Sequence, residues 1–227
     1  DWSSDVCSSD LKVNGWRRNE ARVFVEDGNK FAFKVIDKAA DGRPVWIAVT
    51  NLSQRYNSDC ISGKDIEVDV PTGTTINLNG RALRASIDSV RKVTIKTAGG
   101  DITARNVKEG VTALTYEGDI TLEESWGPIN VETTTGNVVV FDSGPSEIGD
   151  SFKAKTSSGA ISLQRVAHRV MEVSSISGSV LFSGAIKNGG SYAFTTTNGT
   201  IRITLPASTA CKLAARSEEH TSELQSH

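Results

Sequence analysis

The pattern of apolar and polar side chains repeats itself over much of this chain. Apolar and polar positions alternate in short runs that meet at the motif Thr/Ser-x-x-Gly-x-Ile/Val. An alternation with a period of two predicts β-strands that bury one face. The motif occurs as TAGGDI, TYEGDI, TTTGNV, TSSGAI, SISGSV and TTNGTI, with its glycines at Gly100, Gly118, Gly136, Gly159, Gly178 and Gly199.

Each repeat has the same predicted anatomy. One alternating strand enters the turn, the glycine adopts a positive φ that a Cβ would resist, and a second strand leaves. The glycines are 18, 18, 23, 19 and 21 residues apart, so one repeat is too short to bury its own apolar face. Stacked neighbours would bury it together, and the glycines are therefore predicted to be structural turn residues.

The fold predicted from this repeat is an all-β, single-domain β-solenoid, similar to a parallel β-helix, with repeats of roughly 18–23 residues. The alternative is an antiparallel β-meander or sandwich, but two-residue hairpin loops favour Asn-Gly or Asp-Gly, which only Asn198-Gly199 provides. In a solenoid, the first residues of the motifs would form a column whose hydroxyls, roughly 4.8 Å apart, could hydrogen-bond from coil to coil. This structural column would consist of Thr97, Thr115, Thr133, Thr156, Ser175 and Thr196.

The chain before the repeats also contains strand-like segments. We assign residues 12–70 to an N-terminal β region of the same body, because this region contains the strand-like segments ARVFVE, FAFKVID, VWIAVTN and DIEVDV. Residues 71–215 are predicted to form the repetitive solenoid. A degenerate copy of the repeat, NLNGRAL with Gly80, precedes the first full copy. No helical periodicity of convincing length occurs, so the prediction is all-β throughout.

The two ends depart from the pattern, and we predict that they are non-native. RSEEHTSELQS, from Arg216 to Ser226, translates from one strand of an oligonucleotide that resembles a common sequencing adapter. The opening DWSSDVCSSD is the translation of the reverse complement in another frame. Residues 1–11 and 216–227 are therefore set aside as adapter-derived, and the solenoid is expected to be truncated at its C-terminal end.

Charge gives little guidance about partners. The chain has 25 basic and 27 acidic residues, and 24 and 21 remain without the two end segments, a net charge of +3. Arg17, Arg18 and Arg22 lie near Trp16, but no basic stripe continues from them, so we expect a solvated strand and no nucleic-acid partner. No apolar run approaches the roughly 18 residues of a spanning helix, so no membrane span is predicted within the chain.

Few side chains remain as candidates for chemistry. Cys60 and Cys211 are expected to be free thiols, and His168, alone and without paired ligands, is expected in a loop or at the surface. No Ser lies in a G-x-S-x-G motif.

Asp101 and Asp119 follow the glycine in adjacent repeats, with Asn137 next, and would be neighbours on one edge of a solenoid. Paired carboxylates can bind a cation or transfer protons. However, the same position continues as Ala160, Ser179 and Thr200, which is typical of turn chemistry. We therefore expect no catalytic residues, no cofactor and no metal.

A family resemblance follows from longer segments. The chain resembles a bacterial family of unknown function labelled "putative adhesin". The resemblance rests on the repeated turn and on three longer segments, VNGWRRNEARV, IEVDVPTGTTINL and YAFTTTNGTIRITLPA. The resemblance covers nearly all of residues 12–215. It implies a β-solenoid on envelope or secreted proteins, some of them linked to envelope stress, and offers no catalytic residues to transfer.

The functional hypothesis is a non-enzymatic, adhesin-like or scaffolding β-solenoid of the cell envelope or the extracellular space, with an unknown protein or glycan as partner. One alternative is an intracellular or envelope-stress module that binds a protein. A polysaccharide-active β-helix enzyme is less favoured, because only Asp101 and Asp119 approach a cluster of acidic groups. The truncated last coil is expected to cause self-association through its open edge, or fraying at residues 207–215.

Overall fold

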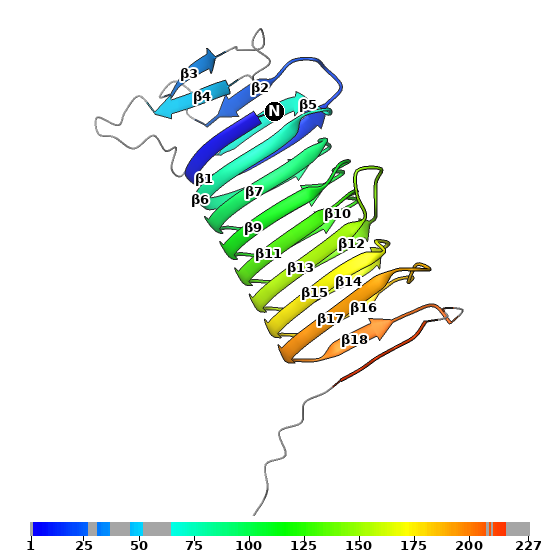
Figure 1. Ribbon diagram of the computed structural model, residues 1–227. Coiled ribbons are helices and arrows are strands. Elements are labelled where there is room, and N and C mark those ends of the chain that lie inside the picture. The colour runs from blue at the N-terminus through cyan, green and yellow to red at the C-terminus, as the bar shows by residue number, and fades with distance from the viewer. Residues whose placement is uncertain are drawn as a thin grey trace, which may run out of the picture.

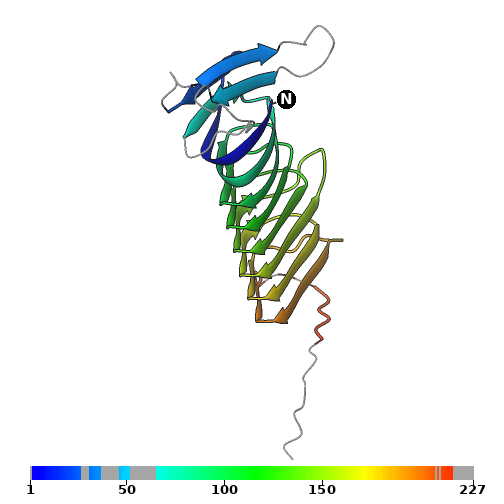
Figure 2. The ribbon, with the colours of Figure 1, turned by 90° about the vertical axis from the view of Figure 1, so that its left-hand side faces the viewer.

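The chain forms a stack of coils, each with a longer and a shorter strand joined at a corner (Figures 1 and 2). The computed structural model describes residues 2–26, 31–36, 46–51, 65–207, 209 and 211–216. Within these residues every regular element is a β-strand.

The two strands of each coil belong to two faces of the stack. The longer strands form what we call the long-strand face: β7 (Lys92–Gly99), β9 (Val111–Glu117), β11 (Ile129–Thr135), β13 (Ser151–Ser158), β15 (Val170–Ser177) and β17 (Ser191–Asn198). The shorter strands form the short-strand face: β8 (Ile102–Arg105), β10 (Ile120–Glu123), β12 (Val138–Ser143), β14 (Ile161–Val166), β16 (Val180–Ser183) and β18 (Ile201–Thr204).

All neighbouring strands within these faces pair in parallel and in register. The result is a parallel β-solenoid of about 7 turns. The predicted fold class is confirmed, and the antiparallel meander is excluded.

The first coil differs from the others. β6 (Thr75–Asp88) curves through both faces and pairs with β7 and then with β8. Gly80 pairs with Thr97, and it is the Leu83 carbonyl that lies against Gly100, so the corner lies near Leu83. The prediction that Gly80 is an early turn glycine was therefore wrong, because a long curved strand crosses this corner without a glycine.

Above β6, the N-terminal strands cover the beginning of the stack. β1 (Trp2–Trp16) pairs in parallel with β6 and with β5 (Ile66–Pro71). The N-terminal segment predicted to be adapter-derived, residues 1–11, lies largely within β1. β2 (Arg22–Val25) pairs antiparallel with β5, while β3 (Phe31–Ile36) and β4 (Trp46–Asn51) form a separate antiparallel sheet. The stack therefore begins with an antiparallel strand.

The core is a set of apolar rows that run along the axis of the stack. Ile102, Ile120, Val138, Ile161 and Val180 form one such row and are fully buried. Complete burial of each Val or Ile contributes roughly 1.5–3 kcal/mol, so the rows are the main source of stability. The row ends differently at the last coil, where Ile201 is 39% exposed because no described strand covers it.

We call the turn from a long strand to the following short strand the glycine corner; the turn between β7 and β8 is the first with a motif glycine. At this corner the backbones of successive coils come unusually close. Five of the six motif glycines have φ between 105° and 153°, while Gly199 is outside the left-handed region. A Cβ on Gly159 would lie 2.0 Å from the carbonyl oxygen of Gly136, and one on Gly199 would lie 2.1 Å from that of Gly178. The close approach of the two backbones therefore requires glycine at position 199, even though φ there does not.

We expect Gly159→Ala to lower the free energy of unfolding by about 3–5 kcal/mol, because the methyl group must displace a backbone carbonyl while the residue keeps a strained φ. Gly73→Ala is the control, since a Cβ there meets nothing within 4 Å, and should change stability by less than about 1 kcal/mol. Urea unfolding measures both. Equal stability of the two variants would contradict the close approach at the corner.

Candidate functional site

The hydroxyl column lies inside the glycine corner. Its members pair in register from Thr97 to Thr196. The Thr156 hydroxyl donates a 2.9 Å hydrogen bond to the carbonyl oxygen of Gly136 in the preceding coil. The hydroxyls of Thr133, Ser175 and Thr196 donate in the same way to Gly118, Gly159 and Gly178. The bonds thus run from coil to coil, but from hydroxyl to carbonyl and not between hydroxyls.

The first two hydroxyls of the column donate within their own coils, although Thr97 Oγ1 also accepts a 3.3 Å hydrogen bond from the Leu83 amide in the preceding coil. Thr97 donates to the carbonyl oxygen of Gly99 at 2.7 Å, and Thr115 donates to that of Glu117 at 3.1 Å. From Thr97 to Ser175 the members are at most 9% exposed. The hydroxyls of the column are consequently bonded to backbone groups, and from Thr97 to Ser175 their side chains are mostly buried.

The carboxylates beside the corner form a ladder with backbone amides. Asp101 Oδ1 accepts from the Asp119 amide at 2.9 Å, and Asp119 Oδ1 accepts from the Asn137 amide at 2.6 Å. Asn137 Oδ1 then accepts from the Ala160 amide at 2.9 Å. The ladder ends there, because alanine has no side-chain acceptor. Each side chain replaces a missing backbone partner in the next turn, as turn chemistry predicts. Among the described residues no His, Cys, Asp or Glu cluster is suited to hold a metal ion.

His168 lies in the loop between β14 and β15, as the loop prediction has it, but it is buried and not at the surface. Its side chain is 0% exposed, and Nε2 lies 2.8 Å from the carbonyl oxygen of Gly127, 41 residues earlier. That separation in sequence corresponds to two coils, so the bond joins coils that are not adjacent in the chain. The ring also packs 5.5 Å from that of Phe152.

The protonation of His168 follows from this position. Burial lowers the pKa of the imidazole, and the hydrogen bond to Gly127 and the charge of Asp150 oppose the shift. Nδ1 is buried without a hydrogen-bond partner among the described residues. The ring is therefore neutral at pH 7 and donates from Nε2.

Other predicted side chains form local contacts or lie outside the described residues. The guanidinium groups of Arg22 and Arg18 lie 4.0 and 5.1 Å from the centroid of Trp16, so the basic residues stack on this ring. Cys211 is an exposed free thiol, while Cys60 lies outside the described residues. The described part of the chain contains no apolar helix long enough to cross a membrane.

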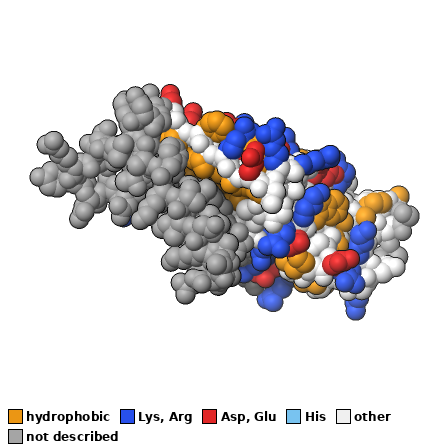
Figure 3. Space-filling view, turned by 90° about the horizontal axis from the view of Figure 1, so that it is seen from above, with side chains coloured by type: hydrophobic (Ala, Val, Ile, Leu, Met, Phe, Trp, Pro, Cys, Tyr) orange, Lys and Arg blue, Asp and Glu red, His pale blue; other side chains and the backbone are white. Residues whose placement is uncertain are grey.

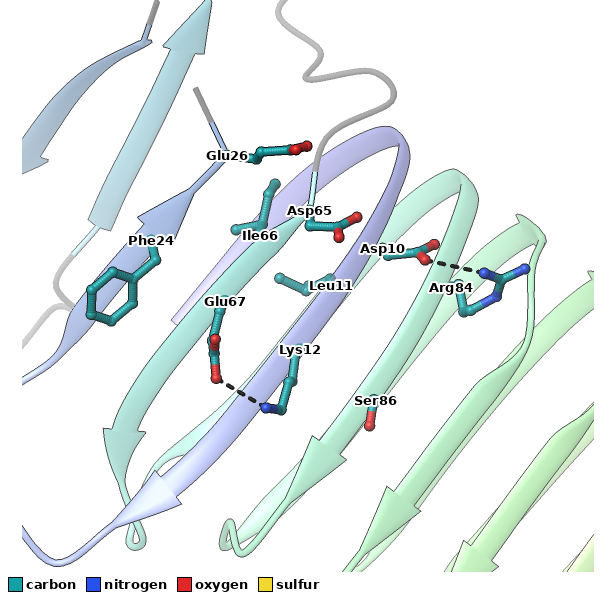
Figure 4. A pocket seen from close by; sticks show the side chains of 10 residues that line it. All are labelled: Asp10, Leu11, Lys12, Phe24, Glu26, Asp65, Ile66, Glu67, Arg84 and Ser86. Carbon is teal, nitrogen blue, oxygen red and sulfur yellow. Dashed lines mark hydrogen bonds and ion pairs between the residues drawn. The ribbon is translucent and has the colours of Figure 1, made fainter. Parts of the chain in front are cut away.

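A cavity of about 520 Å³ lies near the beginning of the stack, between β1, β2, β5 and β6 (Figure 4). Two cations and four carboxylates line it, and both cations form ion pairs. Lys12 pairs with Glu67 and Arg84 pairs with Asp10, both at 3.1 Å. Because Asp10 and Leu11 belong to the segment that we predict to be non-native, this cavity carries no functional proposal.

A second hollow lies on the outer surface of the long-strand face and crosses β9, β11, β13 and β15. This groove, of about 410 Å³, is lined mainly by small hydroxyl side chains, together with Leu114, Glu132 and Lys155. Ile176, 55% exposed, lines the groove, and Tyr116, 60% exposed, lies beside it. On the face seen from above, the hydrophobic side chains lie among charged ones (Figure 3).

The fold and these sites define a class: a parallel β-solenoid with structural corners, a closed apolar core and shallow outer hollows. The chain belongs to the Toastrack DUF4097 family, a family of unknown function whose profile matches residues 6–225. This confirms the resemblance to a solenoid family of unknown function.

The other comparisons add little. No curated protein matches the chain. A solved structure described as a "putative cell adhesion protein" from Clostridium sporogenes ATCC 15579 is 10% identical, with 90% of this chain and 92% of that chain covered. Its TM-score is 0.37, a similarity too low to support an argument about function.

We expect His168 to make stability depend on pH. Because the folded-state pKa lies below the unfolded value of about 6.5, the contribution is complete above pH 6.5 and is lost as pH falls through the folded pKa. Between the unfolded and folded pKa values, the loss is at most about 1.4 kcal/mol per pH unit. Urea unfolding of the natural sequence and of His168→Gln between pH 5.5 and 8 measures it. Parallel pH profiles would contradict a buried neutral imidazole.

Proposed function

We propose that this chain is a non-enzymatic, adhesin-like or scaffolding β-solenoid that acts at the cell envelope or outside the cell. The groove on the long-strand face carries the proposal. It exists only because four coils stack in register, so it presents a surface that extends along the axis of the molecule. Such a surface suits an extended protein or glycan partner better than a compact substrate.

The residues of the groove suit binding more than catalysis. Its ionic side chains pair on the surface, with Glu132 3.6 Å from Lys153, and Lys155 3.3 Å from Glu172. Its apolar contacts lie toward its ends, where Ile176 and Tyr116 are exposed. Elsewhere, Asp101 and Asp119 already accept hydrogen bonds from backbone amides. A non-enzymatic role is consistent with both arrangements.

Removing the two exposed apolar side chains tests this function. We expect the double variant Tyr116→Ser and Ile176→Ser to bind intact bacterial cells about tenfold more weakly than the natural sequence, because these side chains are the largest apolar contacts beside the groove. Flow cytometry with fluorescently labelled protein measures binding. Leu181→Ser is the matched control, because Leu181 is 39% exposed on the short-strand face, away from the groove.

Three results would count against the proposal. Unchanged cell binding by the double variant would reject the groove as the contact surface. Failure of the natural sequence to bind intact cells would favour an intracellular partner-binding module. Release of reducing ends from bacterial polysaccharide would favour an enzyme.

We also propose that the last coil associates with a second copy of the chain. β17 pairs only with β15, and β18 only with β16, among the described strands, so each leaves an open edge. Ile203 is 36% exposed there, whereas Phe182, one coil earlier, is 1% exposed. At the other end of the stack, β2 pairs antiparallel with β5. A second copy stacked head to tail would therefore meet a strand that does not continue the parallel pairing of the coils. Two copies related by a twofold axis could instead pair edge to edge.

We expect Ile203→Lys to weaken dimerisation by about tenfold or more, because it would bury a charge in the shared apolar surface. Leu181→Lys, which adds the same charge outside the open edge, should leave it unchanged. Sedimentation equilibrium of the full chain measures both. A monomer at all concentrations, with strong amide protection in β17 and β18, would reject the edge as an association surface.

A further inference from the structure

The corner at which a short strand leads into the next coil differs chemically from the glycine corner. We call it the polar corner. It places non-glycine residues in the left-handed region in five successive coils: Ser89 (φ 59°), Asn106 (φ 54°), Glu124 (φ 46°), Asp142 (φ 50°) and Arg165 (φ 52°). Side chains disfavour this conformation, and Glu and Arg disfavour it more than Asn and Asp. Glycine would satisfy the backbone more easily, so the polar side chains require a separate explanation.

These side chains converge on a hollow beside an exposed tryptophan. Asn106, Glu124, Asp142 and Arg165 line a cavity of about 350 Å³ together with Lys108, Trp126, Ser143 and Ala167. Two residues after the left-handed position, successive coils carry Lys108, Trp126, Gly144 and Ala167. The change from large to small residues after Trp126 creates the hollow. A Cβ on Gly144 would lie 2.8 Å from Trp126 Cζ3, so the ring occupies the space that this glycine leaves.

The polar side chains of the hollow are fixed and their charges balance. Arg165 binds both carboxylate oxygens of Asp142, Nη2 at 2.6 Å, and Asn106 donates to Asp88 at 2.9 Å. The hydrogen bond from Arg165 lowers the pKa of Asp142, which therefore remains an acceptor at neutral pH. Two cations, Lys108 and Arg165, face two anions, Glu124 and Asp142. This balance disfavours a strongly charged ligand.

We propose that this hollow binds one unit of a neutral carbohydrate. Trp126 is 42% exposed and offers an apolar surface to the C–H groups of a sugar ring. The adjacent donors and acceptors match ring hydroxyls, which donate and accept at once. The inference deepens the proposed function, on which it rests, by assigning a glycan-binding site to the polar corner, separate from the groove.

Titration with neutral trisaccharides, monitored by ¹H–¹⁵N NMR of the full chain, tests this site. Maltotriose, cellotriose, xylotriose and triacetylchitotriose are the probes. We expect at least one to shift the indole N–H of Trp126 and the amides of residues 106, 124 and 142. Trp126→Ala should weaken that binding about 30-fold. Leu181→Ala, which removes a similarly exposed apolar side chain from the short-strand face, outside both the hollow and the groove, should leave it unchanged.

A second variant keeps the test independent of folding. Glu124→Gly removes one polar contact but suits the left-handed backbone, so we expect about fivefold weaker sugar binding with an unchanged or raised unfolding temperature. Unchanged affinity in Glu124→Gly and Trp126→Ala, or no shift with any of the four sugars, would overturn the inference. If cell binding still depends on Tyr116 and Ile176 in that case, the proposed function survives and only the sugar site is rejected.

Discussion

The close approach of backbones at the glycine corner is the constraint on which the rest of the structure depends. From Gly118 onward, each motif glycine lies against the carbonyl of the motif glycine before it, and a Cβ on Gly178 would lie only 1.9 Å from the carbonyl oxygen of Gly159. That carbonyl also accepts the Ser175 hydroxyl at 3.1 Å. Because the same contacts recur in successive coils, they hold the strands parallel and in register. Register then aligns the apolar rows, and their burial supplies the stability.

The two corners divide structural and functional roles. At the glycine corner, contact between backbones excludes side chains, and small hydroxyls and carboxylates satisfy the turn. At the polar corner, successive coils leave room for large polar groups and for Trp126. Larger side chains are therefore accommodated at the polar corner and on the outer faces, where the hollow beside Trp126 and the groove lie. Evolution of binding on such a scaffold would change these positions and preserve the glycines.

Much of the fold follows from local sequence signals. The period of two gave the strands, and the spacing of Gly100, Gly118 and Gly136 gave the coils, because each repeat contains its own turn. The Gly80 prediction failed because β6 curves through its corner without the usual turn. The burial of His168 was missed because it depends on a loop in a different coil, which leaves no signal near residue 168 itself. The exposure of Trp126 likewise depends on Gly144 in the next coil.

Amide hydrogen exchange at the motif glycines tests the central claim most directly. The amides of Gly118, Gly136 and Gly159 donate to the carbonyls of Thr135, Ser158 and Ser177 in the following coils, at 2.9–3.0 Å. If the corners hold the coils in register, these amides should exchange orders of magnitude more slowly than that of Gly73 in the turn before β6. Exchange as fast as at Gly73 would show that the corners do not hold the stack together.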